Sequence, residues 1–360
     1  MHTLQLNAAD TLFFRDGRPF TMGEDTAAEG FFPPPPSVIY GALRTAYMSS
    51  EMNKNKELDD LITESDTLHI HGICLENENE LYLPMPNDLV VSESNKEQAK
   101  RLKFAKTNNI SSNQTIDMLI NTSNEKVVEG TFLLSLMDFQ EYLTKPNKKT
   151  FPCINLSDWV LQETKIGIGR SNETHIAGDG MLYRMRQQRL KTEKGEVKII
   201  VNFDMPNFPT EGVNWLQLGG ERKAVSVKNS DYYAPSLPTI DKEVFKIYLS
   251  TPAIFTKGWM PSFGSSVNII AAAIGKPIHL GGFDVQAGKP KPMLQAVPAG
   301  SVYYLKAESV AKAQELAQKI HGKSISEFEY TNESKKKVHF DTRKQGMGIA
   351  WVGTVNEHEL

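Results

Sequence analysis

The chain has 360 residues with 40 basic and 43 acidic side chains, and its formal net charge of −3 excludes a uniformly basic nucleic-acid-binding protein. Any RNA- or DNA-binding surface must therefore come from local clusters of Lys and Arg. Two distant cysteines (Cys74 and Cys153), no signal peptide over residues 1–7 and no long apolar stretch predict a cytoplasmic protein with reduced thiols and no membrane contact.

The first 170 residues predict the element order β-α-β-β-α-β. Ser37 is a candidate N-cap, and the apolar residues after it recur at helical spacing. Residues 86–130 are polar and lack clear periodicity, so we expect a partly mobile insertion there. The predicted elements are a strand over 2–14 that enters a turn at Asp16-Gly17, a helix over 38–49, a hairpin over 67–76 and 79–84, a helix from Thr131 to Tyr142 and a strand over 158–168.

Residues 241–360 predict a second unit with the same element order. The predicted elements are a strand over 244–250, a short Ala-rich helix over 265–274, a strand near 278–285, a strand over 301–306, a helix over 309–321 that ends at Gly322 and a last strand over 349–355. Residues 171–240 are expected to be an inserted basic hairpin and linker region with a turn at Lys194-Gly195. We therefore predict the α+β class, with two ferredoxin-like (RRM-like) domains with insertions over 1–170 and 241–360.

Near the N-terminus, cations lie beside backbone that a ligand can approach closely. Arg15 and Arg18 flank the predicted turn, and a run of prolines leads into the helix that carries Gly41 and Arg44. Positive charge beside accessible backbone is typical of surfaces that bind polyanions. The Phe-Pro run has a second interpretation, as a surface that contacts a protein.

Two further segments combine glycines with cations. Residues 165–170 read Lys-Ile-Gly-Ile-Gly-Arg, and residues 343–348 read Arg-Lys-Gln-Gly-Met-Gly. Glycine lets backbone N–H groups approach a phosphate, although a strand bulge or a tight turn explains each pair equally well. Neither segment has the third glycine of a dinucleotide-binding fingerprint.

The densest basic cluster is residues 183–191, which hold four cations and no acid. If this segment is a strand, Arg184 and Arg186 lie on one face, with the tyrosine and the methionine on the other. That face would attract an RNA backbone, or it is only a solvated charged face. Residues 218–223 add a glycine turn with two adjacent cations.

Few residues suggest catalysis or metal binding. His69 and His71 would share one face of a strand, but zinc needs further ligands and none lies near in sequence, so we expect neither metal nor cofactor. His175 could act as a general base in RNA cleavage, or only make a polar contact to RNA. Trp259 could stack on a base or on a partner side chain, or pack in the core.

Several motifs occur in a fixed order along the chain. They are Phe-Phe-Arg-Asp-Gly-Arg-Pro-Phe (13–20), Pro-Pro-Pro-Ser-Val-Ile-Tyr-Gly-Ala-Leu-Arg (34–44), Ile-Gly-Ile-Gly-Arg (166–170), Gly-Met-Leu-Tyr (180–183), Leu-Gly-Gly-Glu-Arg (218–222), Thr-Pro-Ala-Ile-Phe with Gly-Trp (251–259), Gly-Gly-Phe-Asp (281–284), Lys-Pro-Met-Leu-Gln-Ala-Val-Pro-Ala-Gly-Ser-Val-Tyr (291–303) and Gly-Met-Gly (346–348). As an ordered set, they resemble the third subunit of the Cmr complex, the RNA-guided type III-B CRISPR effector. That subunit belongs to the RAMP (repeat-associated mysterious protein) superfamily.

The resemblance implies two RRM-like domains packed face to face and a non-catalytic role in antiviral defence. It implies a ribonucleoprotein subunit that binds the 5′ handle of the CRISPR RNA. Its expected protein partners are the large polymerase-domain subunit and the adjacent backbone RAMP subunit, which it would join. The alternative is a RAMP endoribonuclease that cleaves precursor CRISPR RNA through His175 and nearby lysines.

Charge, glycine placement and this resemblance together nominate a set of site residues. The candidate RNA-binding residues are Arg15, Arg18, Arg44, Lys165, Gly167, Gly169, Arg170, His175, Arg184, Arg186, Arg222, Lys223, Arg343, Gly346 and Gly348. The candidates for stacking on a base or contacting a partner are Trp259, Phe31 and Phe32.

Overall fold

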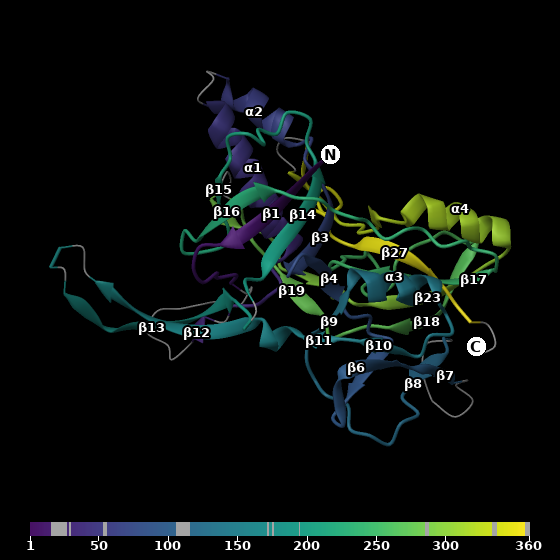
Figure 1. Ribbon diagram of the computed structural model, residues 1–360. Helices are drawn as coiled ribbons and strands as arrows, with labels where there is room; N and C mark the ends of the chain where they lie inside the picture. Colours follow the sequence, from purple (N-terminus) through teal and green to yellow (C-terminus); the bar gives the residue numbers. More distant parts are fainter. Residues whose placement is uncertain are drawn as a thin grey trace.

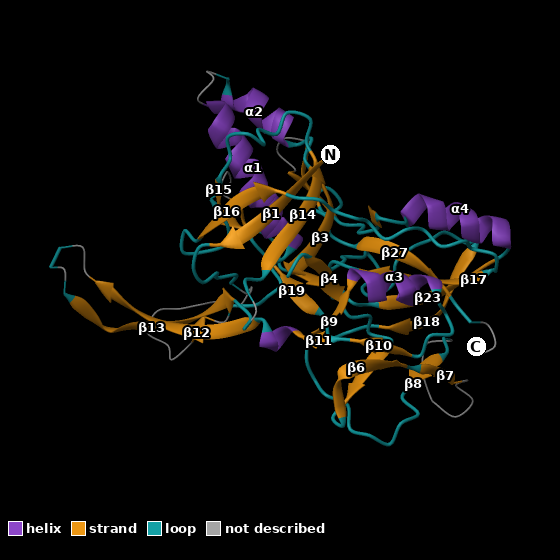
Figure 2. Ribbon diagram, viewed as in Figure 1, coloured by secondary structure: helices purple, strands orange, loops and turns teal. Residues whose placement is uncertain are grey.

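The protein is a mixed α/β structure built mostly from antiparallel sheets with few helices (Figures 1 and 2). The computed structural model describes residues 1–15, 27–28, 30–52, 56–105, 116–170, 173–174, 176–193, 195–284, 288–332 and 337–356. No helix in these ranges is long and apolar enough to cross a membrane. The expected turn at Asp16-Gly17 lies outside the described residues.

The N-terminal half is organised around an eight-stranded sheet with the order β11-β9-β4-β3-β14-β1-β16-β15. The strands are β1 (His2–Ala8), β3 (His69–Asn77), β4 (Glu80–Pro84), β9 (Phe132–Ser135), β11 (Ile154–Asn155), β14 (Lys198–Asp204), β15 (Trp215–Gln217) and β16 (Ala224–Asn229). The predicted β3–β4 hairpin is confirmed: Glu78 and Asn79 form its turn with positive φ. The predicted first strand is shorter than expected, because pairing ends at Ala8.

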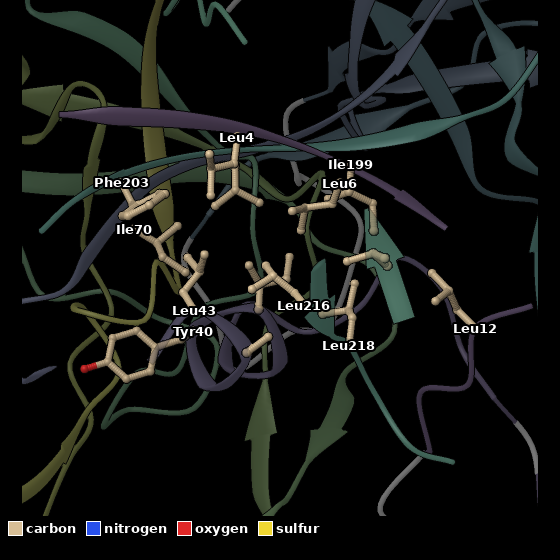
Figure 3. Packing of buried hydrophobic residues seen from close by; sticks show 14 of the residues in the cluster. Leu4, Leu6, Leu12, Tyr40, Leu43, Ile70, Ile199, Phe203, Leu216 and Leu218 are labelled. Atoms are coloured by element: carbon tan, nitrogen blue, oxygen red, sulfur yellow. The ribbon is translucent and has the colours of Figure 1, made fainter. Parts of the chain in front are cut away.

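Helix α1 (Pro36–Met52) packs against one face of this sheet. Proline suits the first helical position, where its missing N–H is not needed, so the helix starts before the expected residue. Leu4 and Leu6, two apart on β1, point toward Leu43 and Tyr40 on α1 (Figure 3). The period-two pattern of the strand thus meets the helical stripe in one core. Helix α2 (Leu58–Ser65) follows and packs on α1.

A five-stranded sheet with the order β18-β23-β17-β27-β24 forms the C-terminal half. The elements are β17 (Val244–Leu249), β18 (Val267–Ala273), β23 (Val302–Ala307), α4 (Val310–Ile320), β24 (Lys323–Ser324) and β27 (Ile349–Thr354). The predictions for β17, β23, α4 and β27 are confirmed. The Ser309 hydroxyl accepts a hydrogen bond from the Lys312 N–H at the start of α4, and Gly322 follows its end with a φ of 69°.

The predicted helix over 265–274 is wrong, because this segment is strand β18. β18 pairs antiparallel with β23 from Val267 to Ala273. Its three alanines favour a helix, but Val267 and Ile269 are β-branched and fit a strand. Pairing within the sheet therefore outweighs the local helix propensity of alanine.

The segment expected to be an insertion over 86–130 contains ordered strands in its described part. β5 (Leu89–Ser92), β6 (Asn95–Arg101) and β10 (Thr150–Pro152) form a three-stranded sheet, and β7 (Lys103–Ala105) pairs with β8 (Met118–Ile120). The helix predicted from Thr131 begins later, as α3 (Leu136–Thr144). Residues 132–135 form β9 instead, and the N-cap is Ser135, whose hydroxyl accepts from the Asp138 N–H.

Residues 171–240, expected to be an insertion, supply parts of two different sheets. β12 (Val160–Arg170) and β13 (Ala177–Leu190) form a hairpin that projects from the body of the molecule (Figure 1). β2 (Ala27–Ala28) pairs with β13 in parallel. At the expected turn, Thr192 pairs with Gly195, and Lys194 is outside the described residues. β14 follows this turn and lies between β1 and β3 in the eight-stranded sheet.

The remaining elements are short, and all but η1 belong to the C-terminal half of the chain. They are η1 (Leu156–Asp158), β19 (Ile278–Leu280), β20 (Phe283–Asp284), β21 (Lys289–Pro290), β22 (Leu294–Ala296), β25 (Glu329–Asn332) and β26 (Lys337–Asp341). The strand predicted near 278–285 is therefore divided into β19 and β20, which pair with β22 and β21.

A buried group of charged and aromatic residues, the Asp88 cluster, joins the two halves. Asp88 is fully buried and accepts hydrogen bonds from the hydroxyls of Tyr142 on α3 (2.8 Å) and Tyr304 on β23 (2.5 Å). Arg101 on β6 and Lys246 on β17 lie 3.6 and 4.0 Å from the same carboxylate. Residues from both halves therefore depend on one buried negative charge.

Candidate nucleic-acid interface

A groove of about 1140 Å³ lies where the two halves meet. One wall comes from the N-terminal half: α1, residues 13–15 and the segment around β15. The other wall comes from residues 279–282 and 290–293 of the C-terminal half. The groove thus brings together five motifs of the sequence, those at 13–20, 34–44, 218–222, 281–284 and 291–303.

Three glycines, Gly41, Gly219 and Gly220, lie in the N-terminal wall of the groove. The Gly220 N–H donates to the Phe13 carbonyl at 2.8 Å, and a Cβ at Gly219 would lie 2.5 Å from that same oxygen. Gly219 also has a φ of 80°, which other residues rarely adopt. Gly41 on α1 differs, because a Cβ there would meet nothing within 4 Å. The glycine turn is needed for packing on Phe13, whereas Gly41 leaves open space in the groove.

The described lining of the groove holds two cations, Arg15 and Lys291, together with the imidazole of His279. Arg15 and His279 are exposed, and the Lys291 ammonium lies 4.6 Å from the centroid of the Phe340 ring. Among the described lining residues there is no carboxylate. A low-dielectric cleft lined by one sign of charge concentrates ligands of the opposite sign.

Trp215 provides the largest exposed aromatic surface of the groove. It lies on the edge strand β15, lines the groove and is 59% exposed. An exposed indole is a platform on which an unpaired base can stack, with about 1–3 kcal/mol per base. The groove therefore combines cations, accessible backbone and an aromatic face.

The β12–β13 hairpin places the basic strand as the sequence predicted. In its register Arg184 faces Ile166 and Arg186 faces Thr164, whereas Tyr183 faces Gly167 on the other side of the ribbon. Both arginines are exposed. The hairpin therefore presents a face that mixes guanidinium groups with exposed isoleucine.

Gly167 of this hairpin has a structural role. A Cβ at Gly167 would lie 2.1 Å from the Tyr183 ring, so the glycine makes room for the ring. The pairing register shifts at Gly169, since Ile168 pairs with Leu182 and Arg170 with Ala177. The additional residues at this shift lie on β13.

Gly346 and Gly348 lie in a buried turn, which fits the tight-turn alternative from the sequence. Both are buried with positive φ values of 77° and 73°. A Cβ at Gly346 would lie 2.7 Å from Ile70 on β3, and one at Gly348 would lie 3.0 Å from the Ser326 N–H nitrogen. This turn docks the C-terminal half on the eight-stranded sheet.

Several candidate cations form ion pairs within the chain. Arg44 joins α1 to the end of α2 through Asp66 (2.9 Å) and the Ser65 hydroxyl (2.7 Å). Arg343 pairs with Asp341 and Glu329. Lys165 and Lys223 both approach Asp10, and Arg222 is exposed in the preceding turn.

The aromatic candidates pack within the fold and are only partly exposed to solvent. The Trp259 ring stacks on Tyr303, whose hydroxyl donates to the Trp259 carbonyl at 2.6 Å. Phe31 packs in the C-terminal half, and Phe32 packs in the core of the N-terminal half, so these neighbours join the two halves. Arg18 and His175 lie outside the described residues, as does the Arg170 side chain.

The paired histidines do not gain further ligands. The rings of His69 and His71 stack with centroids 6.4 Å apart, and burial lowers the pKa of each. Within the described ranges, no group of three metal-ligating side chains could hold a metal ion. Cys74 and Cys153 are both buried as free thiols, and burial raises the pKa of Cys153 to about 11.

Comparison with protein families identifies the family of this chain. Residues 4–354 match the model of a family described as CRISPR-associated protein (Cas_Cmr3). The chain belongs to this family. The match confirms the resemblance to the third Cmr subunit and makes this Cas_Cmr3 member a type III CRISPR effector subunit. No curated protein matches the chain.

Solved structures share the fold of this Cas_Cmr3 member. A chain in the cryo-EM structure of the Type III-B Cmr-beta bound to cognate target RNA and AMPPnP, state 1, has a TM-score of 0.54 and 17% identity, over 93% of this chain and 98% of that chain. A chain in the structure of Cmr-beta bound to cognate target RNA has a TM-score of 0.52 and 18% identity, over 88% and 89%. At these identities the likeness shows the fold alone.

Sequence reasoning missed two lining residues of the Cas_Cmr3 groove. Trp215 is a single aromatic beside a polar run, and no local pattern marks it as exposed. Lys291 lies within the 291–303 motif, but only one other cation, Lys289, is near it in sequence, so it does not form a basic cluster. Alternation would have helped at Trp215, because the exposed-buried-exposed pattern of β15 places it opposite the core.

Proposed function

We propose that this Cas_Cmr3 chain is an RNA-binding scaffold subunit that holds the 5′ handle of the CRISPR RNA in the groove. It bridges the large polymerase-domain subunit to the adjacent backbone RAMP subunit in a cytoplasmic type III-B complex and performs no catalysis itself. The observation that carries the proposal is the convergence of family motifs on one cationic, glycine-walled groove.

The groove suits a short single-stranded segment of defined shape. Its backbone walls follow a strand closely at Gly41 and at the Gly219–Gly220 turn, and Arg15 and Lys291 supply positive charge. Proteins recognise single-stranded RNA mainly by stacking splayed bases and by contacting base edges and backbone. Trp215 offers the stacking surface.

We also propose that each half contains a ferredoxin-like unit, with the N-terminal unit extending past residue 170, where the sequence prediction had ended it. In the N-terminal half, β3, β14, β1 and β16 are neighbours in that order, with α1 between β1 and β3 in sequence. In the C-terminal half, β18, β23, β17 and β27 follow the same pattern, with α4 between β23 and β27. The shared order supports a repeated unit in which the first C-terminal helix is missing.

The decisive experiment changes the charge of the groove at Gly41. Because a side chain there meets open space, Gly41→Gln and Gly41→Glu should both fold, and they differ only in charge. In the assembled complex, Gly41→Glu should weaken binding of the guide RNA by several-fold more than Gly41→Gln does. Equal affinity of the two variants would place the handle elsewhere.

Two further measurements test the partners and the absence of catalysis. Co-purification with the large subunit, followed by sequencing of the bound RNA, should give a uniform 5′ handle. Incubation of the purified chain with labelled repeat RNA should give no cleavage. Cleavage that is lost on His175→Ala would instead establish the endoribonuclease alternative.

A further inference from the structure

Three cations converge on one carboxylate at the root of the β12–β13 hairpin. Arg189 Nη2 lies 2.9 Å from Asp10 Oδ1, and Lys223 Nζ and Lys165 Nζ lie 3.3 and 3.7 Å from Asp10 Oδ2. We name these four residues the Asp10 cluster. They come from three separate parts of the chain: the end of β1, the hairpin and the turn before β16.

The Asp10 cluster carries more positive than negative charge. Besides Asp10, Glu163 pairs with Arg189, so two carboxylates face three cations. Lys165 and Lys223 share a single carboxylate oxygen. Burial and the neighbouring Lys165 lower the pKa of Lys223, as expected for two ammonium groups held close together. A second anion would relieve this repulsion.

The cluster is rigid because its neighbours hold it. Lys223 Nζ also donates to the Thr11 hydroxyl at 2.9 Å, and that hydroxyl donates to Gln187 Oε1 at 2.5 Å. Lys223 is only 12% exposed, whereas Lys165 is 47% exposed. The structure therefore fixes the inner ammonium and leaves the outer one accessible from solvent.

The Asp10 cluster continues the wall of the groove. Lys223 closes the turn that contains Gly219 and Gly220, since its carbonyl accepts from the Leu218 N–H at 2.8 Å. Thr11 lies two residues before Phe13, on which that turn packs. A strand that leaves the groove across the glycine turn therefore meets the cluster next.

We propose that Lys165, Arg189 and Lys223, positioned by Asp10, form a subsite for one backbone phosphate of the RNA strand that leaves the groove. This inference rests on the proposed function, because it takes the groove as the RNA-binding site. Phosphate is the ligand of choice because Arg and Lys make charge-assisted hydrogen bonds to its oxygens. Asp10 acts as a positioning residue that keeps like charges together.

The test uses the assembled complex and labelled guide RNA over a range of KCl concentrations. Lys165→Gln removes the accessible cation and should reduce the slope of log K against log salt by about 0.7, the value for one phosphate contact on a single strand. Lys312→Gln is the matched control, since Lys312 is an exposed lysine in an ion pair on α4, and it should leave the slope unchanged. Lys223→Gln should act in the same direction as Lys165→Gln.

The outcomes separate this inference from the proposed function. If Gly41→Glu weakens binding but both lysine variants retain the wild-type slope, the subsite is wrong and the groove stands. If none of the variants changes binding, both ideas fail. If inorganic phosphate raises the melting temperature of the chain in a Lys165-dependent way while the RNA slope is unchanged, the cluster binds free phosphate and the proposal is overturned.

Discussion

Asp88 is a fully buried carboxylate that lies between the two halves of the protein and pairs with Arg101. Replacing it with Asn keeps its shape but leaves the Arg101 guanidinium without a counter-charge 3.6 Å away. Tyr142 and Tyr304 also lose their charged acceptor. At an effective dielectric constant of about 20, two charges 4 Å apart attract by about 4 kcal/mol.

We expect Asp88→Asn to lower the free energy of unfolding by about 3–5 kcal/mol, the usual cost of breaking a buried pair by removing one partner. That loss is a large part of the stability of a typical protein, about 5–15 kcal/mol. Equilibrium urea unfolding can measure it through the fluorescence of Trp159 and Trp351, which are 5% and 2% exposed.

The control for this experiment is Asp241→Asn, which makes the same chemical change at an exposed position. It should alter the free energy of unfolding by less than about 0.5 kcal/mol. If the free energy of unfolding of Asp88→Asn is within about 1 kcal/mol of the wild-type value, the cluster does not depend on the Asp88 charge and the electrostatic reasoning is wrong.

Three other predictions concern the hairpin, the groove wall and pH. The double change Arg184→Ala and Arg186→Ala should weaken guide-RNA binding and reduce its salt slope by about 1.4, at about 0.7 per phosphate contact; an unchanged slope would mean a solvated face. Gly219→Ala should destabilise the chain by more than about 1 kcal/mol, because φ is 80° and a carbonyl oxygen is 2.5 Å from the new Cβ. Gly41→Ala, in an open helical position, should stabilise the chain by about 1 kcal/mol. The melting temperature should therefore fall for the first variant and rise for the second, and the opposite result for either variant would contradict this reasoning. Burial and Arg101 hold the pKa of Lys246 well below its usual value. Above that folded-state pKa the unfolded chain binds one more proton than the folded chain, so the free energy of unfolding should rise with pH. Lys246→Met should flatten this rise in urea titrations between about pH 7 and 9.5.

Elements with strong local signals could be predicted from the sequence. Helix α4 has a stripe of apolar residues, a serine N-cap and a terminal glycine, and all three lie within one short segment. Strands β17, β23 and β27 consist mostly of buried apolar and aromatic residues. In these cases local preference and tertiary packing favour the same structure.

Elements that depend on distant partners could not be predicted. β9 is a short buried run, Phe132 to Ser135, whose sequence does not distinguish a strand from the start of a helix. β14 lies between β1 and β3, a placement that only the pairing of distant residues determines. Gly346 shows the same limit, because a positive φ requires glycine whether the turn is exposed or packed on Ile70.

The candidate site was predictable in its parts and not in its assembly. Arg15, Gly41 and the Gly219–Gly220 turn were recognised from charge and glycine placement, and the structure brings them to one groove. Arg44 was not distinguishable from them by sequence, since its partner Asp66 lies 22 positions away, directly after helix α2. Ion pairs between residues so far apart cannot be predicted from the local sequence.

The two walls of the groove come from different halves of the chain, and this has a thermodynamic consequence. A ligand that touches both walls binds only the docked arrangement, so its binding free energy adds to the docking of the halves. At a ligand concentration of about 100 times Kd, this linkage amounts to about 2.7 kcal/mol. By the same linkage, a substitution that loosens the docking, even one as remote as Asp88→Asn, lowers the apparent affinity of the groove without touching the ligand.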